Sequence, residues 1–291
     1  EHGPGPGSAS PLATLEQGEA MTRKRSILGI VAGGTGVAGS GAAGEALAGW
    51  GALNLTQGVT PISREVYDLH MLILWICVVI GVVVFGVMIY SIIRFRKAKG
   101  AEAAQFHEST SVEILWTIIP FLILVGMAIP ATGTLITMEN TRKPELTVKV
   151  TGYQWKWEYE YLGEDVSFFS NLGTPVDAIQ NREAKDPNYL RKVDNRLVLP
   201  TGQKIRFLVT AADVIHAWWV PELGMKKDAI PGFVNEMWAR IDEPGVYRGQ
   251  CAELCGRGHA YMPIVIEAKR PEAFQQWLDK LREGSRVADT E

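Results

Sequence analysis

One stretch near the C-terminus reads Gln250-Cys-Ala-Glu-Leu-Cys255-Gly-Arg-Gly-His259-Ala-Tyr-Met262-Pro263. Its two cysteines stand four residues apart, and a histidine and a methionine follow within the next seven residues. Thiolate, imidazole and thioether groups are ligands that select copper, whereas magnesium and calcium take oxygen ligands. The stretch therefore predicts a copper site, with His216 further upstream as a second candidate imidazole.

Two other readings of the cysteine pair remain open from the residues alone. The pair could form a disulfide in an oxidising compartment, or bind zinc together with the two histidines. Met262 favours copper, because a thioether is a poor zinc ligand and a familiar axial ligand of copper. A mononuclear blue-copper site needs one cysteine, so the second thiolate indicates another metal ion or another explanation.

Three segments resemble subunit II of heme-copper cytochrome c oxidases, over about residues 50–282. They are the loop Cys251–Pro263, the aromatic stretch Gly152–Tyr161, and Gly224-Met-Lys-Lys-Asp-Ala-Ile-Pro-Gly232. The resemblance implies a CuA centre of two copper ions. The ligands that it implies are the bridging thiolates Cys251 and Cys255, the histidines His216 and His259, the weak ligand Met262, and the backbone carbonyl of Glu253.

The same resemblance implies an electron-transfer function. Trp155 is expected to be the exposed ring where an electron enters from cytochrome c, and Glu158, Glu160 and Asp213 match acidic docking positions for a lysine-rimmed donor. Lys156 stands where many relatives have tyrosine. The electron would pass to a heme held only by the partner subunit I, where oxygen is reduced and protons are pumped. The Glu253 side chain is expected to reach a magnesium or manganese ion shared with subunit I.

Three rival functions share some of these features. A quinol oxidase subunit II lacks the copper ligands that are present here. A nitric oxide reductase with a CuA domain would differ only in its partner subunit. A membrane-tethered copper carrier would explain the metal loop, but not the matches at Glu113, Trp155 and Glu253 together.

The composition indicates apolar blocks joined to a polar domain. The chain has 291 residues, 47% of them hydrophobic, and a formal net charge of −3, and no nucleic-acid partner is expected. Residues 1–20 carry no periodicity and are interpreted as a disordered extension upstream of a start at Met21. Residues 21–48 combine a basic beginning, an apolar core and small residues near Ala48, which is the pattern of a secretory signal peptide.

Two uncharged runs predict a transmembrane hairpin within residues 49–142, with spans of about 69–93 and 114–138. Arg94, Arg96, Lys97 and Lys99 close the first span, so the short connecting loop is expected to face the cytoplasm. The protein is then a multi-pass protein of the bacterial inner membrane, in contact with lipid, with both ends of the hairpin on the periplasmic side. Subunit III is a further expected partner.

Glu113 heads the second span and allows two interpretations. An acid in a first helical turn is favoured by the helix dipole. By the family resemblance, it matches a glutamate at the cytoplasmic mouth of a proton channel in subunit I, and so serves proton uptake.

From residue 143 onward the hydrophobic period changes from that of helices to that of strands. Alternating segments such as Leu146–Val150 and Ile205–Val209 predict an antiparallel sandwich over residues 143–270, and the resemblance makes it a cupredoxin-like Greek-key copper domain. Residues 163–195 are predicted to be a polar surface excursion, and residues 271–291 a C-terminal helix and tail. The expected fold class is thus α+β: a two-helix membrane hairpin, an all-β domain and a short helix.

Overall fold

The computed structural model describes residues 54–288, with side chains for residues 54–283. The predicted extension over residues 1–20 and the predicted signal peptide over residues 21–48 lie outside this range.

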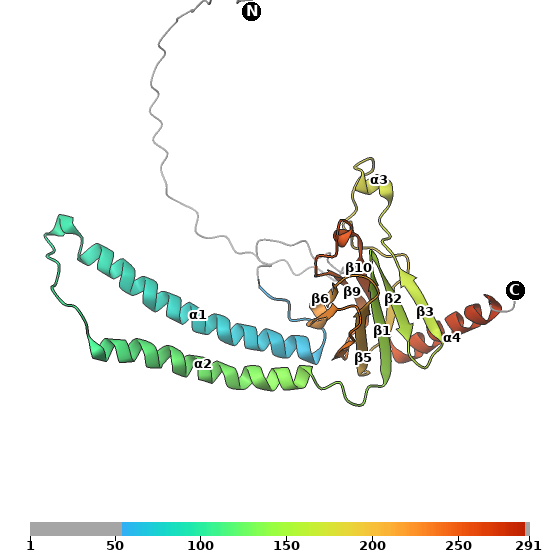
Figure 1. The fold of residues 1–291 in the computed structure, drawn as a ribbon, viewed down its shortest axis with the longest axis horizontal. Coiled ribbons are helices and arrows are strands. Elements are labelled where there is room, and N and C mark those ends of the chain that lie inside the picture. The colour runs from blue at the N-terminus through green and yellow to red at the C-terminus, as the bar shows by residue number, and fades with distance from the viewer. Residues whose placement is uncertain (1–53, 289–291) are drawn as a thin grey trace, which may run out of the picture. The chain divides into compact units, whose positions relative to one another are not determined.

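Two long apolar helices come first (Figure 1). α1 spans Pro61–Arg94 and α2 spans Thr110–Met138, with the short 3₁₀ helix η1 (Lys97–Lys99) between them. Both long helices have the length and composition to cross a membrane. Both begin before the predicted spans, because an uncharged run marks only the apolar part of a helix and not its polar first turns.

The hairpin is anchored to the following domain at both of its ends. Thr60 caps α1 through a reciprocal pair of hydrogen bonds with Ser63, and its hydroxyl donates to the carbonyl of Leu223 at 2.8 Å. At the end of α2, the indole Nε1 of Trp238 donates to the carbonyl of Thr137 at 3.0 Å. Both anchors satisfy polar groups where the chain changes from helix to sheet.

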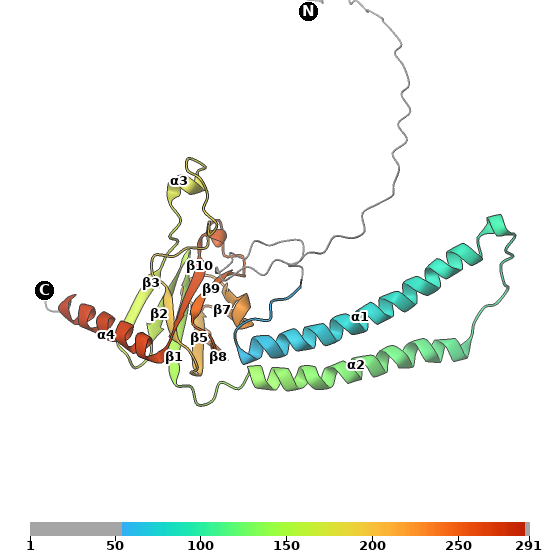
Figure 2. The same ribbon diagram turned by 180° about the vertical axis from the view of Figure 1, so that it is seen from behind.

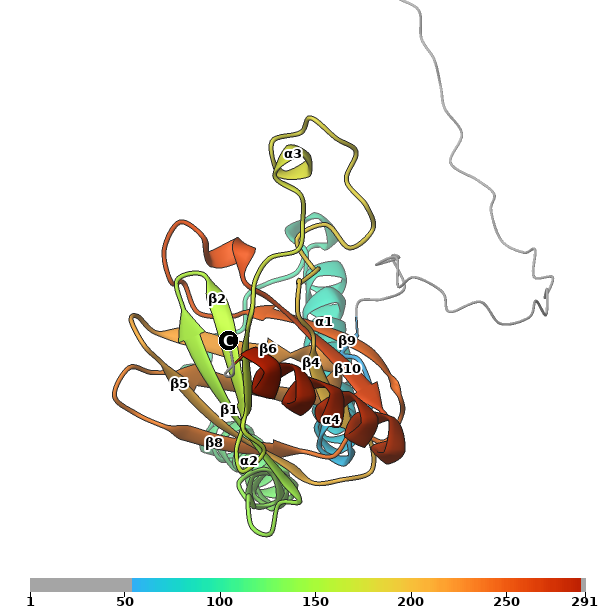
Figure 3. The ribbon, with the colours of Figure 1, turned by 90° about the vertical axis from the view of Figure 1, so that its right-hand side faces the viewer.

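The β-domain consists of two five-stranded sheets packed face to face (Figures 2 and 3). The first has the order β3-β2-β1-β5-β8 and the second β4-β10-β9-β6-β7. The strands of the first sheet are β1 (Leu146–Tyr153), β2 (Lys156–Tyr161), β3 (Val166–Ser170), β5 (Ile205–Ala211) and β8 (Asn235–Ala239). Those of the second are β4 (Leu197–Pro200), β6 (His216–Val220), β7 (Met225–Ala229), β9 (Gly245–Cys251) and β10 (Pro263–Lys269).

The sheets are mixed rather than purely antiparallel. β1 pairs with β5 in parallel, and β10 pairs with β4 in parallel, whereas the other neighbours run antiparallel. The antiparallel expectation was therefore wrong for two pairs. Alternating hydrophobicity identifies the face of a strand that is buried, but it carries no information about the direction of the neighbouring strand.

The predicted surface excursion over residues 163–195 contains ordered structure. β3 pairs with β2 within it, and the one-turn helix α3 (Val176–Ile179) follows. The Val-Ser-Phe-Phe-Ser run of β3 is only five residues long, so its pattern is too short to stand out from a polar loop.

The core of the domain lies between the two sheets, because inward residues alternate with polar ones on each strand. On β2 the buried side chains are Trp157, Tyr159 and Tyr161, and the polar side chains between them are only partly buried. The core forms one continuous cluster that reaches from these rings to the cysteines of the metal-ligand loop.

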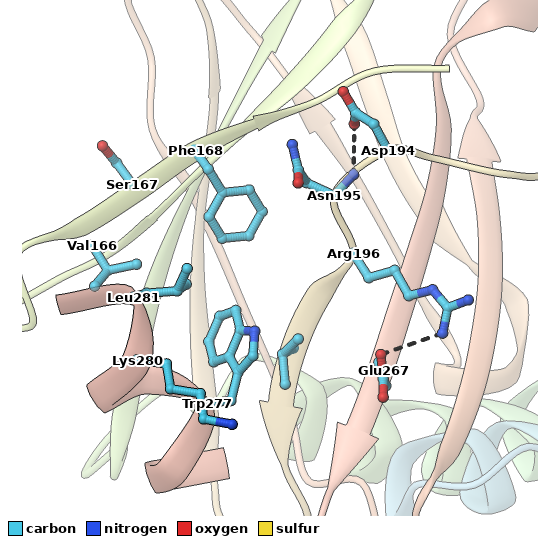
Figure 4. Close-up of a pocket in the computed structure, with 11 residues that line it drawn as sticks. Val166, Ser167, Phe168, Asp194, Asn195, Arg196, Glu267, Trp277, Lys280 and Leu281 are labelled. Atoms are coloured by element: carbon cyan, nitrogen blue, oxygen red, sulfur yellow. Dashed lines mark hydrogen bonds and ion pairs between the residues drawn. The ribbon is translucent and has the colours of Figure 1, made fainter. Parts of the chain in front are cut away.

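The C-terminal helix α4 (Pro271–Ala288) packs against β3 of one sheet and against β4 and β10 of the other, through buried Phe274 and Leu278. Trp277 of α4 borders a pocket of about 480 Å³ that Phe168, Lys280 and the ion pair Arg196–Glu267 also line (Figure 4).

Candidate metal centre

The metal-ligand loop, residues 251–262, connects β9 to β10. Cys251 is the last residue of β9, and the 3₁₀ helix η3 (His259–Tyr261) precedes Pro263, the first residue of β10. Gly256 has a φ of +114°, which non-glycine residues rarely adopt, and its carbonyl accepts a hydrogen bond from the His259 N–H at 3.1 Å. The turn folds the second half of the loop back over the first.

This turn brings the sulfur atoms of the loop together. Sγ of Cys251 and Sγ of Cys255 lie 3.9 Å apart, and Sδ of Met262 lies 3.5 Å from Sγ of Cys255. Nδ1 of His259 lies 3.6 Å from Sγ of Cys255. Both thiols and the thioether are almost completely buried, whereas His259 is half-buried.

His216 reaches the same cluster from a different strand. It is the first residue of β6, it is fully buried, and its Nδ1 lies 3.9 Å from Sγ of Cys251. Two residues further along, Trp218 pairs with Cys251 across the β6–β9 ladder. This register places the His216 side chain next to the Cys251 thiol. Nε2 of His216 donates to Oδ1 of Asp213 at 2.9 Å, because an ionised carboxylate can only accept. That bond leaves Nδ1 directed to the sulfur atoms.

Residues that the sequence analysis did not assign to the site hold its ligands in place. The indole of Trp157 packs edge-on against His216 with 5.9 Å between ring centroids, and its Nε1 donates to the carbonyl of Met262 at 3.2 Å. The side chain of Gln154 donates to the carbonyl of Cys255 at 2.9 Å. Both residues lie in the aromatic stretch Gly152–Tyr161. Its resemblance to the family was the one feature of the sequence that indicated a role for this segment.

The two thiols have very different affinities for their protons. Burial opposes ionisation of Cys251, but its interactions with His216 and with backbone groups outweigh burial and lower its pKa to about 7. Burial and the neighbouring Cys251 thiolate raise the pKa of Cys255 to about 12. In the metal-free protein the pair therefore holds at most one negative charge near neutral pH, and a bound cation is what allows the second thiol to ionise.

The donor set fits a copper centre. A metal–sulfur bond is about 2.3 Å long, so two sulfurs 3.9 Å apart can share one ion. His216, Cys251 and Cys255 offer donor atoms that all lie within 4.8 Å of one another. A thioether within the same cluster favours copper over zinc. The carbonyl of Glu253 lies 3.3 Å from Sγ of Cys251 and is the nearby oxygen donor, whereas the Glu253 side chain is exposed.

Trp155 lies against the outer side of the loop. Its ring is half-buried, rather than exposed as the resemblance led us to expect, and its Nε1 donates to the carbonyl of Cys255 at 3.2 Å. Gly258 is what permits this contact, because a Cβ at that position would lie 2.6 Å from Cγ of Trp155. The indole is thus hydrogen-bonded directly to the backbone of a proposed ligand.

The three acids that are expected to dock cytochrome c make different contacts. Glu158 and Glu160 share the polar face of β2. Glu158 accepts from the hydroxyl of Tyr153 at 2.9 Å, and Glu160 pairs with Lys149 at 3.0 Å. Asp213 instead supports His216. Burial opposes ionisation of Asp213, but hydrogen bonds from His216 and from two backbone N–H groups hold the pKa of its carboxyl below the usual range.

Two other residues singled out in the sequence lie away from the sulfur cluster. The ammonium of Lys156 lies 3.7 Å from the ring centroid of Phe169, on β3. Glu113 lies in the first turn of α2, where it is exposed.

Comparison with known families gives matches over most of the chain. The family described as "Cytochrome C oxidase subunit II, periplasmic domain" matches residues 146–269, and "Cytochrome C oxidase subunit II, transmembrane domain" matches residues 48–132.

Individual proteins match as well. A protein of Rickettsia conorii named probable cytochrome c oxidase subunit 2 is 42% identical over 221 residues, which is 75% of this chain and 68% of that protein. Cytochrome c oxidase subunit 2 of Cereibacter sphaeroides is 35% identical over 248 residues, covering 81% of this chain and 82% of that protein. The crystal structure of the periplasmic domain of subunit II of cytochrome oxidase of Bradyrhizobium japonicum is 39% identical and covers 50% of this chain and 98% of its own, with a TM-score of 0.43.

Proposed function

This chain belongs to the cytochrome c oxidase subunit II family, and we propose from that premise that it carries single electrons from cytochrome c to a heme in subunit I. It is a membrane protein and a subunit of a heme-copper oxidase complex, which implies assembly with subunit I. Oxygen reduction and proton pumping belong to the partner in this proposal, since the chain's own donor groups suit electron transfer.

One observation supports the proposal above all others. Within a single loop and one neighbouring strand, three sulfur and two imidazole donors lie in a chain of contacts of 3.5–3.9 Å. Cys251, Cys255, His216, His259, Met262 and the carbonyl of Glu253 would hold two copper ions as a CuA centre. When bound, such a pair supplies a one-electron redox centre in which the charge is shared between both ions.

The protein's part in electron transfer is to keep these donors still. Asp213 fixes the ring orientation of His216, and Trp157 holds both that ring and the backbone of Met262. Burial excludes water from the sulfur atoms. Donors that move little between two oxidation states keep the reorganisation cost of the transfer low.

Trp155 is the residue through which we propose that the electron enters. Its indole is only partly buried, and the hydrogen bond from its Nε1 to the carbonyl of Cys255 connects the ring to a proposed bridging cysteine. Glu158, Glu160 and Asp213 are the acids proposed to position cytochrome c.

The remaining assignments concern the rest of the complex. The exposed side chain of Glu253 is proposed to reach a magnesium or manganese ion shared with subunit I. Glu113 is proposed to serve proton uptake at the cytoplasmic side. The copper domain is proposed to face the periplasm of a bacterial inner membrane, in contact with lipid and with subunit III as a further neighbour.

The decisive experiment is a copper count and an electron paramagnetic resonance spectrum of the purified complex and of a Cys251→Ser variant. The wild-type spectrum should show one unpaired electron coupled to two copper nuclei, and the variant should hold at most one ion at this site, because a hydroxyl cannot replace a bridging thiolate. Cys77→Ser, which changes a cysteine of α1, is the matched control and should keep the wild-type spectrum. A wild-type spectrum from a single copper nucleus would refute the proposal.

A further inference from the structure

Arg257 projects a positive charge beside the proposed point of electron entrance. It lies in the metal-ligand loop between Cys255 and His259, it is exposed, and its guanidinium lies 5.8 Å from the ring centroid of Trp155. At that distance a cation and an indole face attract each other weakly. A partner that contacts the Trp155 edge must therefore also meet this guanidinium.

The acids of the same surface have partners within the chain. Glu160 is paired with Lys149, Glu158 accepts from Tyr153, and Asp213 accepts from His216 and from the N–H of Gln154 at 2.7 Å. Among the described residues, no carboxylate lies within 4.0 Å of Arg257. Arg257 is thus a charged group of this surface that has no ion-pair partner among the described residues.

The charges around Trp155 are balanced rather than acidic. Glu158 and Asp213 contribute two negative charges, while Lys156 and Arg257 contribute two positive ones; Glu160 is compensated by Lys149. A purely lysine-rimmed donor would meet repulsion at Arg257 as well as attraction at the acids.

We propose that Arg257 is a specificity-determining residue for the electron donor, which presents a carboxylate beside its heme edge to pair with this guanidinium. The inference rests on the proposed function, because it takes Trp155 as the point where the donor docks. The donor is a cytochrome c with mixed charge around the heme edge. Its association with the oxidase depends less steeply on salt than that of a uniformly basic donor with an acidic surface.

The test uses the assembled oxidase and two donors of opposite charge. One is a cytochrome c with lysines around its heme edge, and the other is the same cytochrome with two of those lysines replaced by glutamate. The variants are Arg257→Glu and Arg257→Gln. The control is Lys280→Glu on α4, which makes the same charge change at an exposed position.

Lys280 is a matched control because of its place in the fold. The neighbouring Arg282 pairs with Glu164 in the turn after β2, whereas Trp155 lies in the turn before β2. Six residues of strand separate the two turns by about 20 Å, more than twice the Debye length of about 8 Å at physiological salt. A charge at Lys280 is therefore screened from the docked donor.

The measured quantity is the ratio of kcat/KM for the glutamate-bearing donor to kcat/KM for the lysine donor. Arg257→Glu should lower this ratio by about tenfold at low salt, Arg257→Gln by about threefold, and Lys280→Glu should leave it unchanged, with the differences shrinking as salt rises. If the Arg257 variants slow both donors equally, with the copper spectrum intact, the guanidinium only packs against Trp155 and the inference is overturned. If the wild-type complex holds no copper pair, or oxidises neither donor, the proposed function fails and the inference fails with it.

Discussion

Oδ1 of Asp213 lies 2.9 Å from Nε2 of His216. An acid that is expected to dock cytochrome c is therefore hydrogen-bonded to a proposed copper ligand. The docking role and the supporting role predict different behaviour on mutation. Partners of metal-bound histidines typically contribute 10–100-fold to metal affinity.

We therefore expect Asp213→Ala to lower the copper affinity of the complex by about 10–100-fold. Asp213→Asn should have a smaller effect, because the amide oxygen can still accept from Nε2. Copper titration with the resonance spectrum as readout measures both, and Glu160→Gln, on β2, is the control that should keep wild-type affinity. A variant that changes only the salt dependence of cytochrome c oxidation would show that Asp213 acts in docking alone.

Trp155→Gln should reduce kcat for cytochrome c oxidation severely while KM and the copper spectrum stay close to wild type. The variant removes the indole that contacts the Cys255 carbonyl, without removing a charge from the docking surface. Trp219→Gln, at an indole that is 40% exposed on β6, is the matched control and should retain turnover. Equal loss in both variants would indicate a general effect of removing surface tryptophans.

The metal-free protein should show one thiol that ionises near neutral pH. The pKa of Cys251 is lowered to about 7 and that of Cys255 is raised to about 12, so thiolate absorbance should rise by most of one equivalent between pH 6 and 8 in a Cys77→Ser background. Cys251→Ser should abolish this step and lower the pKa of Cys255, because the neighbouring thiolate that repels a second charge is gone.

The same shift predicts one contribution to the pH dependence of stability. A cysteine in the unfolded chain keeps its proton to higher pH than Cys251 does in the fold. Cys251 therefore stabilises the metal-free fold increasingly as pH rises from 7 toward 9, and this contribution is lost as pH falls through about 7. Burial lowers the pKa of His216, but its interactions with Cys251 and Asp213 outweigh burial and raise it, so the contribution of His216 has the opposite sign. Unfolding midpoints at pH 6 and pH 8 measure the sum of the two contributions, which should be smaller than the Cys251 contribution alone.

Glu113→Gln should lower the turnover of the complex while leaving the copper spectrum and cytochrome c binding unchanged. A carboxylate at the end of α2 that we propose to face the cytoplasm can collect protons from water, and the amide cannot. If Glu113 only favours the start of the helix, the change costs about 0.3–1 kcal/mol in stability and does not alter turnover. Glu108→Gln, in the loop before α2, makes the same chemical change outside the helix and should keep wild-type activity.

The sequence alone predicted the paired apolar helices and the β-sheet class of the domain, and it pointed to the metal-ligand loop as a candidate site. These features are local. Four of the ligand side chains lie within 12 consecutive residues, so the covalent chain keeps them near one another before any tertiary packing. The uncharged runs likewise predict helices, because inside a membrane the backbone N–H and C=O groups have no water to bond and a helix pairs them within one segment.

The tertiary structure decided which distant residues complete the site. His216 lies 35 residues from Cys251, and only the β6–β9 register brings the imidazole to the thiol. Gln154 and Trp157 reach the loop because the turn between β1 and β2 lies at the same end of the sandwich as the loop. The parallel pairing of β1 with β5 also depends on how the chain crosses between strands. Spacing along the chain cannot specify such contacts, because they depend on strand register and on the packing of two sheets against each other.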